Sequence, residues 1–300
     1  APAQQRRQKG AGRPMGTVTI VGVGLIGGSY GLALRERGLA SRVIGCARTQ
    51  ATLDAALQRG AADEVTADVA EACRQADLVI LCQPPEAVVG MMPLVDGAVG
   101  ADAVVTDAAS VKVPVVTAAE ANLSRPGRFV GGHPMAGSER TGVEHAKADL
   151  FEGANYVLTP TSSTSDDALG VVRDLAEGLG ARVRVMPPEE HDRAVAAASH
   201  APHAVAAALT RAVLTNSAAV EVHGAGLRDT TRVAASDAAM WRQILLANAV
   251  AVLDALEQVQ GELDALRNAL AARDEARVEE WLRDAAVLRR ALDSAAEDDA

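Results

Sequence analysis

His133 is the residue whose setting most favours chemistry. It lies in the run from Gly131 to Glu139, which reads GGHPMAGSE, and the flanking glycines and proline disfavour a regular helix. An imidazole that titrates near neutral pH and can be approached between glycines is a common proton acceptor. A loop histidine bonded only to nearby backbone is the alternative. We interpret His133 as a candidate catalytic residue on a loop.

A glycine pattern lies near the start of the chain, after the apolar run Thr17–Val21 and before a helical stretch. Gly22 permits a tight turn, Gly24 lets the backbone approach a pyrophosphate, and Gly27 lets helix and strand pack closely. The helix N-terminus offers unpaired N–H groups to phosphates. A glycine turn without a ligand is the alternative. We expect a dinucleotide to bind at Gly22, Gly24, Leu25, Ile26 and Gly27.

The residues that select between NAD and NADP are expected about 20 residues later, at the end of the second strand. The chain reads Gly45-Cys46-Ala47-Arg48-Thr49 there, without the Asp or Glu that would accept the ribose hydroxyls of NAD. Arg48 and Thr49 offer hydrogen bonds to a 2′-phosphate. The pattern therefore favours NADP over NAD. The alternative is that Arg48 is a solvated loop charge and that selectivity is loose.

A polar segment from Thr106 to Lys112 follows another strand and precedes a helix. In an open α/β sheet this position lies beside the ligand crevice, at the carboxyl ends of the strands. Ser110 is therefore a candidate contact to substrate or nicotinamide. It is equally suited to be an ordinary helix N-cap.

Histidines recur in the second half of the chain, in Ser199-His200-Ala201-Pro202-His203. Pro202 should kink or restart the helix, and His200 and His203 share one helix face. They are candidates for a substrate pocket, a metal site with His191 or Asp192, or ordinary core positions. Because the HExxH spacing and an obvious third ligand are absent, we predict no metal site.

Two arginines, Arg228 and Arg232, lie four residues apart in this acidic protein. Arginine suits bidentate binding of a carboxylate. A surface ion pair with Asp229 or Glu221 is the alternative. Downstream, Ser236 and Asp237 are expected to cap the helix that carries Trp241.

The elements that must position these residues change character near Pro187-Pro188. Before it, short apolar runs alternate with helical stretches, as in βαβ units with a mainly parallel sheet. After it, Ala-rich helical sequence runs almost to the end, with a coiled-coil-like seam at Leu256, Val259, Leu263, Leu266 and Leu270. We predict an α/β fold: a disordered tail (1–15), a Rossmann NAD(P)-binding domain (16–187) and an all-α helical dimerisation and substrate domain (188–300).

The net charge of −10 argues against nucleic acid or an anionic membrane as the main partner. No run approaches the roughly 18 apolar residues of a membrane span, and the start lacks the apolar region of a signal peptide. We therefore expect a cytoplasmic protein that binds a small-molecule substrate. The long apolar helical faces predict a homodimer.

Five motifs, in order over about residues 17 to 295, resemble the prephenate/arogenate dehydrogenases of tyrosine biosynthesis. They are the glycine loop from Gly22, the segments from Asp107 to Lys112 and from Gly132 to Glu139, the pair of histidines, and Arg228 to Arg232. The resemblance implies a Rossmann domain, a helical dimerisation domain and oxidative decarboxylation of a cyclohexadienol.

The resemblance also implies roles for individual residues. His133 would accept the proton of the ring 4-hydroxyl, Ser110 would hydrogen-bond the same hydroxyl, and Arg232 would bind a carboxylate. His200, His203, Glu139 and Trp241 would line or gate the pocket. Arg228 stands where the family often has lysine, which makes its role less specific.

The substrate's side chain is left open between prephenate and arogenate, with a slight preference for arogenate paired with NADP. A 4-amino-4-deoxyprephenate-type substrate and a non-catalytic NADP-sensing protein are the alternatives. A β-hydroxyacid dehydrogenase shares the layout but uses a lysine base in its helical domain, and residues 188–298 contain no lysine.

Overall fold

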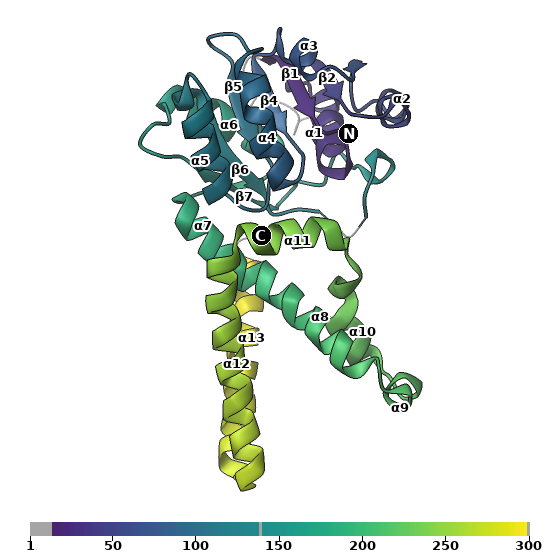
Figure 1. Ribbon diagram of the computed structural model, residues 1–300, viewed down its shortest axis with the longest axis vertical. Coiled ribbons are helices and arrows are strands. Elements are labelled where there is room, and N and C mark those ends of the chain that lie inside the picture. Colours follow the sequence, from purple (N-terminus) through teal and green to yellow (C-terminus); the bar gives the residue numbers. More distant parts are fainter. Residues whose placement is uncertain (1–13, 138–139, 299–300) are drawn as a thin grey trace, which may run out of the picture. The chain divides into compact units, whose positions relative to one another are not determined.

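The computed structural model describes residues 14–137 and 140–298 (Figure 1). The chain forms two compact units, Ala1–Asn248 and Ala249–Ala300. The first contains the whole sheet and the helices up to α11, and the second contains α12 and α13.

Eight strands form one sheet in the order β3-β2-β1-β4-β5-β6-β7-β8. Strands β1 to β6 pair in parallel, β7 is antiparallel to β6, and β8 is parallel to β7. The strands are β1 (Met15–Val21), β2 (Ala40–Cys46), β3 (Glu64–Thr66), β4 (Leu78–Leu81), β5 (Val104–Asp107), β6 (Phe129–Pro134), β7 (Asn155–Thr159) and β8 (Arg182–Val185).

Helices connect most of the strands. They are α1 (Leu25–Glu36), α2 (Gln50–Gln58), α3 (Val69–Cys73), α4 (Pro85–Asp96), α5 (Val113–Asn122) and α6 (Asp166–Gly178), with short 3-10 turns η1 (Pro126–Arg128) and η2 (Val143–His145). Helix α6 begins after a polar loop, and the Ser165 hydroxyl caps it by accepting the Ala168 N–H.

The sheet is buried on both faces, which gives three layers (Figure 1). Along β4, Leu78 and Ile80 pack into the cluster that contains α1 and α6, while Val79 and Leu81 pack against α3, α4 and α5. Alternating side chains point to opposite faces of a strand, so a strand covered on both sides is apolar throughout.

The carboxyl ends of the parallel strands meet at one edge of the sheet. The glycine turn follows β1, the segment with Ser110 follows β5, and His133 lies near the end of β6. The strand order reverses between β1 and β4, and open α/β sheets bind ligands at such a switch point. The fold therefore gathers these motifs at one edge.

The Rossmann-like fold and the following helical region are confirmed, with two corrections. The short strand β3 was missed because only three residues pair with β2. Met15 was assigned to the tail, but its N–H donates to the Leu39 carbonyl at 2.8 Å and it begins β1. The predicted tail otherwise lies almost wholly outside the described residues, and the domain boundaries remain predictions.

After β8, the described residues are helical. They form α7 (Pro188–Val195), a π-helical turn η3 (Ala196–His200), α8 (Ala201–Val213), α9 (Ser217–Glu221), α10 (Ala225–Thr231), a 3-10 turn η4 (Arg232–Ala235) and α11 (Ala238–Ala247). The expected restart at Pro202 is confirmed, because Pro202 occupies the first turn of α8, where its missing N–H costs no helical bond.

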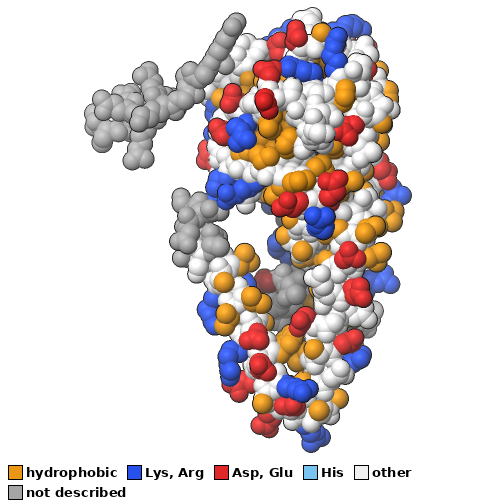
Figure 2. Space-filling view, turned by 90° about the vertical axis from the view of Figure 1, so that its left-hand side faces the viewer, with side chains coloured by type: hydrophobic (Ala, Val, Ile, Leu, Met, Phe, Trp, Pro, Cys, Tyr) orange, Lys and Arg blue, Asp and Glu red, His pale blue; other side chains and the backbone are white. Residues whose placement is uncertain are grey.

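The C-terminal unit is a pair of helices, α12 (Ala249–Ala272) and α13 (Glu275–Asp298). Helix α12 runs unbroken through Gly261, and the chain turns at Arg273, whose φ is +53°. Leu263 and Leu270 of the predicted seam are exposed, and hydrophobic side chains lie among charged ones on the surface (Figure 2).

Within the described residues no single helix has the length and apolar character to cross a membrane. One bent pair, α11 with α12, passes that test of length and composition.

Candidate active site

The three glycines after β1 differ in what a side chain would meet there. Gly22 has a φ of +99° and accepts a hydrogen bond from the Gly24 N–H at 3.0 Å, which closes the turn. A Cβ on Gly27 would lie 2.1 Å from the Gly22 carbonyl oxygen, whereas a Cβ on Gly24 would meet no atom of the described residues within 4 Å. Gly24 thus borders open space directly before Leu25 and Ile26, the first residues of α1. A dinucleotide phosphate fits this arrangement.

The end of β2 presents the two residues expected to select the cofactor. Arg48 is exposed directly after the strand. The Thr49 hydroxyl caps α2 by accepting the Thr52 N–H at 3.3 Å. Thr49 therefore has a structural partner, and Arg48 is the more available of the two.

A buried ion pair fixes the segment that carries Ser110. The side chains of Lys112 and Asp107 are both fully buried and form a salt bridge. Lys112 Nζ also donates to the Gly132 carbonyl at 2.7 Å, and Asp107 accepts the backbone N–H groups of Ala109 and Gly132. These bonds tie the end of β5 to β6 one residue before His133. Ser110 is half-buried, and the cap position of α5 falls at Lys112 instead.

His133 belongs to strand β6 and not to a loop, which corrects the expectation from its glycine neighbours. It pairs with Val157 of β7 and is 9% exposed. The neighbouring glycines serve close packing: a Cβ on Gly131 would lie 2.3 Å from the Thr159 hydroxyl, and one on Gly132 would lie 2.7 Å from the Asp107 carbonyl oxygen. The glycines indicated a loop in the sequence, but a closely packed strand requires the same residue type.

A chain of hydrogen bonds leads from His133 into α7. His133 Nδ1 lies 2.8 Å from His191 Nε2, and His191 Nδ1 lies 2.7 Å from Asp192 Oδ1. The Asp192 carboxylate also accepts the backbone N–H groups of Lys112 and Val113, at 2.7 and 2.9 Å. It thereby caps α5 from another helix.

The electrostatics of this network keep His133 neutral. Burial, together with His191, Lys112 and His200, holds the pKa of His133 well below its ordinary value of 6.5. Burial alone would raise the pKa of Asp192, but its hydrogen bonds from His191 and from the backbone of Lys112 and Val113 outweigh burial and lower it. A neutral imidazole is thus linked to an ionised carboxylate.

The histidine pair of the helical region forms a second cluster. The Asn248 side-chain amide donates to the Asp192 carbonyl at 2.7 Å and lies 3.2 Å from His200 Nδ1. The Trp241 ring packs edge-on to His200 and stacks on His203 with centroids 3.4 Å apart. Burial lowers the pKa of His200 to about 4. His203 Nδ1 is buried and has no hydrogen-bond partner among the described residues.

The remaining candidates lie apart from this network or outside the described residues. Arg228 and Arg232 are exposed on α10 and η4, both of which pack against α8, the helix of His203. Asp237 caps α11 by accepting the Met240 N–H at 2.7 Å, as expected for the helix of Trp241. Glu139 lies outside the described residues.

Sequence reasoning considered His191 and Asp192 only as metal ligands and did not consider Asn248. The available signal was the adjacent His-Asp pair at the start of an Ala-rich helix, although its partners are 58 and 80 residues away. Among the described residues, no group of three or more His, Cys, Asp or Glu side chains is placed to hold a metal ion.

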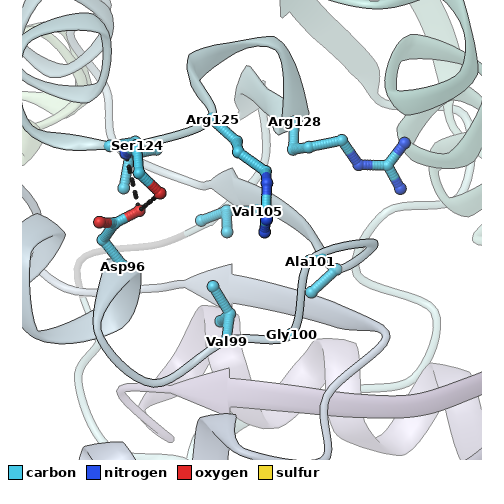
Figure 3. A pocket seen from close by; sticks show the side chains of 10 residues that line it. Asp96, Val99, Gly100, Ala101, Val105, Ser124, Arg125 and Arg128 are labelled. Carbon is cyan, nitrogen blue, oxygen red and sulfur yellow. Dashed lines mark hydrogen bonds between the residues drawn. The ribbon is translucent and has the colours of Figure 1, made fainter.

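A separate small hollow lies near the start of β5, between Val99 and Arg125 (Figure 3). Asp96 accepts hydrogen bonds from the Ser124 N–H and hydroxyl at 2.8 and 2.9 Å, which closes one side. None of the candidate residues that the structure describes lines it.

Residues 30–185 match the family model described as "Prephenate dehydrogenase, nucleotide-binding domain", and residues 187–284 match "Prephenate dehydrogenase, dimerization domain". The chain belongs to the prephenate dehydrogenase family. It is therefore a dehydrogenase in which a dinucleotide-binding domain precedes a helical dimerization domain.

Individual relatives agree with this family. The prephenate dehydrogenase of Bacillus subtilis (strain 168) is 37% identical over 256 residues, which cover 84% of this chain and 69% of that protein. The Aquifex aeolicus prephenate dehydrogenase, solved with hydroxyphenyl propionate and NAD+, superposes with a TM-score of 0.87 at 34% identity, covering 93% of this chain and 98% of that one. Synechocystis arogenate dehydrogenase gives a TM-score of 0.80 at 32% identity, with coverage of 92% and 99%.

Proposed function

We propose that this protein oxidatively decarboxylates arogenate or prephenate, with NADP as the preferred hydride acceptor and NAD as the alternative. The observation that carries the proposal is the placement of a buried, neutral His133 at the sheet edge that also holds the glycine turn. A base and a dinucleotide site at one edge match a reaction that removes a proton and a hydride from the same alcohol.

His133 takes the proton of the 4-hydroxyl while C4 gives up a hydride, so the O–H and C–H bonds break and C4 becomes a carbonyl. When bound, the nicotinamide accepts that hydride. The electron pair of the bond to the ring carboxylate then enters the ring, CO2 leaves, and the ring becomes aromatic. The proton held by His133 returns to the phenolate oxygen, and no net proton is released.

Other residues bind and orient the substrate in this proposal. Ser110 lies two residues before Lys112, whose ammonium is fixed by Asp107 and the Gly132 carbonyl, and it hydrogen-bonds the same hydroxyl. Arg232, with Arg228 beside it, binds a substrate carboxylate by paired hydrogen bonds. His200, His203, Trp241 and Glu139 line or gate the pocket, and the stack of Trp241 on His203 supplies an apolar wall.

The preference for NADP rests on Arg48, the exposed cation after β2, and on the absence of an acid there. Arg48→Ala should raise the Kd of NADP by about 10- to 100-fold, because a hydrogen bond to a charged group contributes about 1.5–3 kcal/mol. NAD affinity, which lacks the 2′-phosphate, serves as the internal control and should stay unchanged. Equal effects on both cofactors would contradict the preference.

We also propose that the protein works as a homodimer through its helical region, supported by the dimerization-domain match and the exposed Leu263 and Leu270. The cytoplasmic location remains a prediction. The proposed reaction at His133 does not depend on the dimer or on the location.

The deciding experiment is an assay of prephenate and arogenate, each with NAD and NADP, that follows cofactor reduction together with CO2 release. We expect both products to appear at equal rates, fastest with arogenate and NADP. A 4-amino-4-deoxyprephenate arm tests the alternative substrate. Failure of both prephenate and arogenate to reduce either cofactor would overturn the proposed function.

A further inference from the structure

We propose that His191 and Asp192 are positioning residues that fix the tautomer of His133, leaving its Nε2 as the atom that accepts the substrate proton. The inference rests on the proposed function, in which His133 is the base, and it adds which nitrogen reacts and what selects it. The two ring nitrogens of a histidine are distinct, and the hydrogen bond at one sets the state of the other.

The direction of the hydrogen bonds between Asp192, His191 and His133 is set at Asp192. An ionised carboxylate only accepts hydrogen bonds, and the two backbone groups that it contacts, on Lys112 and Val113, only donate. His191 Nδ1, 2.7 Å from Asp192 Oδ1, must therefore carry a hydrogen. The hydrogen bonds that lower the pKa of Asp192 keep it in this accepting state.

His191 passes this constraint on to His133. When His191 is neutral, the hydrogen on its Nδ1 leaves its Nε2 without one, so Nε2 is an acceptor. His133 Nδ1, 2.8 Å away, is then the donor, and the remaining lone pair of neutral His133 lies on Nε2. The side chains of His191 and His133 are buried, so water competes little for either bond.

The same arrangement supports His133 after it takes a proton. Its Nδ1–H remains bonded to His191, which is in turn bonded to the Asp192 carboxylate. Among the described residues, the other charged group near His133 is Lys112, whose ammonium is paired with Asp107, and His200 is the remaining titratable neighbour. An orienting acid that stabilises an imidazolium through hydrogen bonds is the logic of a catalytic triad.

Asn248 gives His200 the opposite tautomer. Its amide nitrogen donates to the Asp192 carbonyl, which identifies that atom as the NH2 group, and the same nitrogen lies 3.2 Å from His200 Nδ1. His200 Nδ1 is therefore an acceptor and its Nε2 carries the hydrogen. These contacts thus leave His133 with an Nε2 that accepts a hydrogen bond and His200 with an Nε2 that donates one.

Three substitutions of His191 separate its hydrogen bond to Asp192 from its hydrogen bond to His133. An Asn amide reaches roughly the position of Nδ1, and a Gln amide that of Nε2. His191→Leu removes both bonds, His191→Asn keeps a donor for Asp192 but no acceptor for His133, and His191→Gln restores an acceptor for His133. The hydrogen bonds in the structure assign these roles.

We expect His191→Leu and His191→Asn to lower kcat by about 10- to 100-fold, part of the 10²- to 10⁴-fold that a positioned base contributes. His191→Gln should recover most of this loss. The Kd of the cofactor should stay within about 2-fold of wild type in all three, because the glycine turn is untouched. A merely structural role for His191 would not produce recovery by Gln alone.

Nitrogen NMR of isotope-labelled histidine in the wild-type protein reads the tautomer directly. The proposal predicts hydrogen on Nδ1 of His133 and on Nε2 of His200, and loss of the fixed His133 tautomer in His191→Leu. His133→Asn, assayed in parallel, tests the base itself.

The outcomes distinguish the inference from the proposed function. Hydrogen on Nε2 of neutral wild-type His133, or wild-type kcat in His191→Leu while His133→Asn is inactive, would overturn the inference and leave the function intact. Full turnover by His133→Asn would overturn the function. If His191→Leu does not fold, the wild-type spectrum and His191→Gln still decide.

Discussion

The glycine turn after β1 and the histidine network around β6 lie at one sheet edge but are built in different ways. The turn uses consecutive residues from Gly22 to Gly27, and its geometry comes from the backbone and from missing side chains. The network joins side chains from β5, β6, α7 and η3 through buried hydrogen bonds. Binding is therefore locally encoded, whereas the chemistry depends on tertiary structure.

The largest effect should come from separating binding from chemistry at His133. His133→Asn keeps an amide donor near His191 but lacks a nitrogen at the position of Nε2, so kcat should fall by about 10²- to 10⁴-fold. Cofactor titration should give an unchanged Kd, because Gly22 and Gly24 lie on another strand end. If His133→Asn lost cofactor affinity together with kcat, the two regions would not be separable in this way.

Lys112→Met tests the buried ion pair that supports the network. It leaves Asp107 buried and unpaired, which should lower the free energy of unfolding by about 3–5 kcal/mol. Chemical denaturation measures this change. Lys147→Met, at an exposed lysine, is the matched control and should change stability by no more than about 0.5 kcal/mol. Equal effects at both sites would contradict the assigned role of the pair.

His200 should make stability depend on pH. Its folded pKa is about 4 against an ordinary 6.5, so between these values the unfolded state binds a proton that the folded state does not. Stability attributable to His200 is present above pH 6.5 and is lost as pH falls, by about 3 kcal/mol at pH 4. In His200→Asn, which keeps an acceptor for Asn248, the loss between pH 7 and pH 4 should be smaller by that amount. If His200→Asn lost as much stability between pH 7 and pH 4 as wild type does, the burial argument would be wrong.

Gly24→Ala should have the smallest effect and a selective one. Its Cβ would enter the open space beside the turn without touching the chain, so stability should hold while cofactor Kd rises about 10-fold, or about 1.4 kcal/mol. Gly27→Ala is the comparison, because its Cβ meets the Gly22 carbonyl oxygen and should lower stability as well. Identical behaviour of the two variants would contradict their different surroundings.

The contrast explains what sequence alone could predict. The dinucleotide turn, the alternation of strands and helices, and the caps at Ser165 and Asp237 depend on neighbouring residues, and each could be predicted. The short β3 could not, because its three residues pair only once β2 is in place. A strand of only three residues is not stable alone, and its pairing with β2 stabilises it.

The site was predicted in its parts but not in its connections. His133, Ser110 and His200 were identified by type and spacing, yet His133 was placed on a loop. The bonds from His191 to His133 and from Asp192 to α5 span 58 and 80 residues, and no local pattern specifies them. Buried polar side chains need partners, but a sequence does not show which partner folding brings near.

The central claim is that a buried, neutral His133 is the base, and the pH dependence of kcat/KM in the wild-type enzyme tests it most directly. Burial and the neighbouring His191, Lys112 and His200 lower the pKa of His133, and a base works only when unprotonated. We predict that kcat/KM stays level as pH falls through 6.5 and decreases only well below it, with the residual activity of His133→Asn lacking that decrease. A decrease centred at or above pH 6.5, or the same decrease in His133→Asn, would contradict the account.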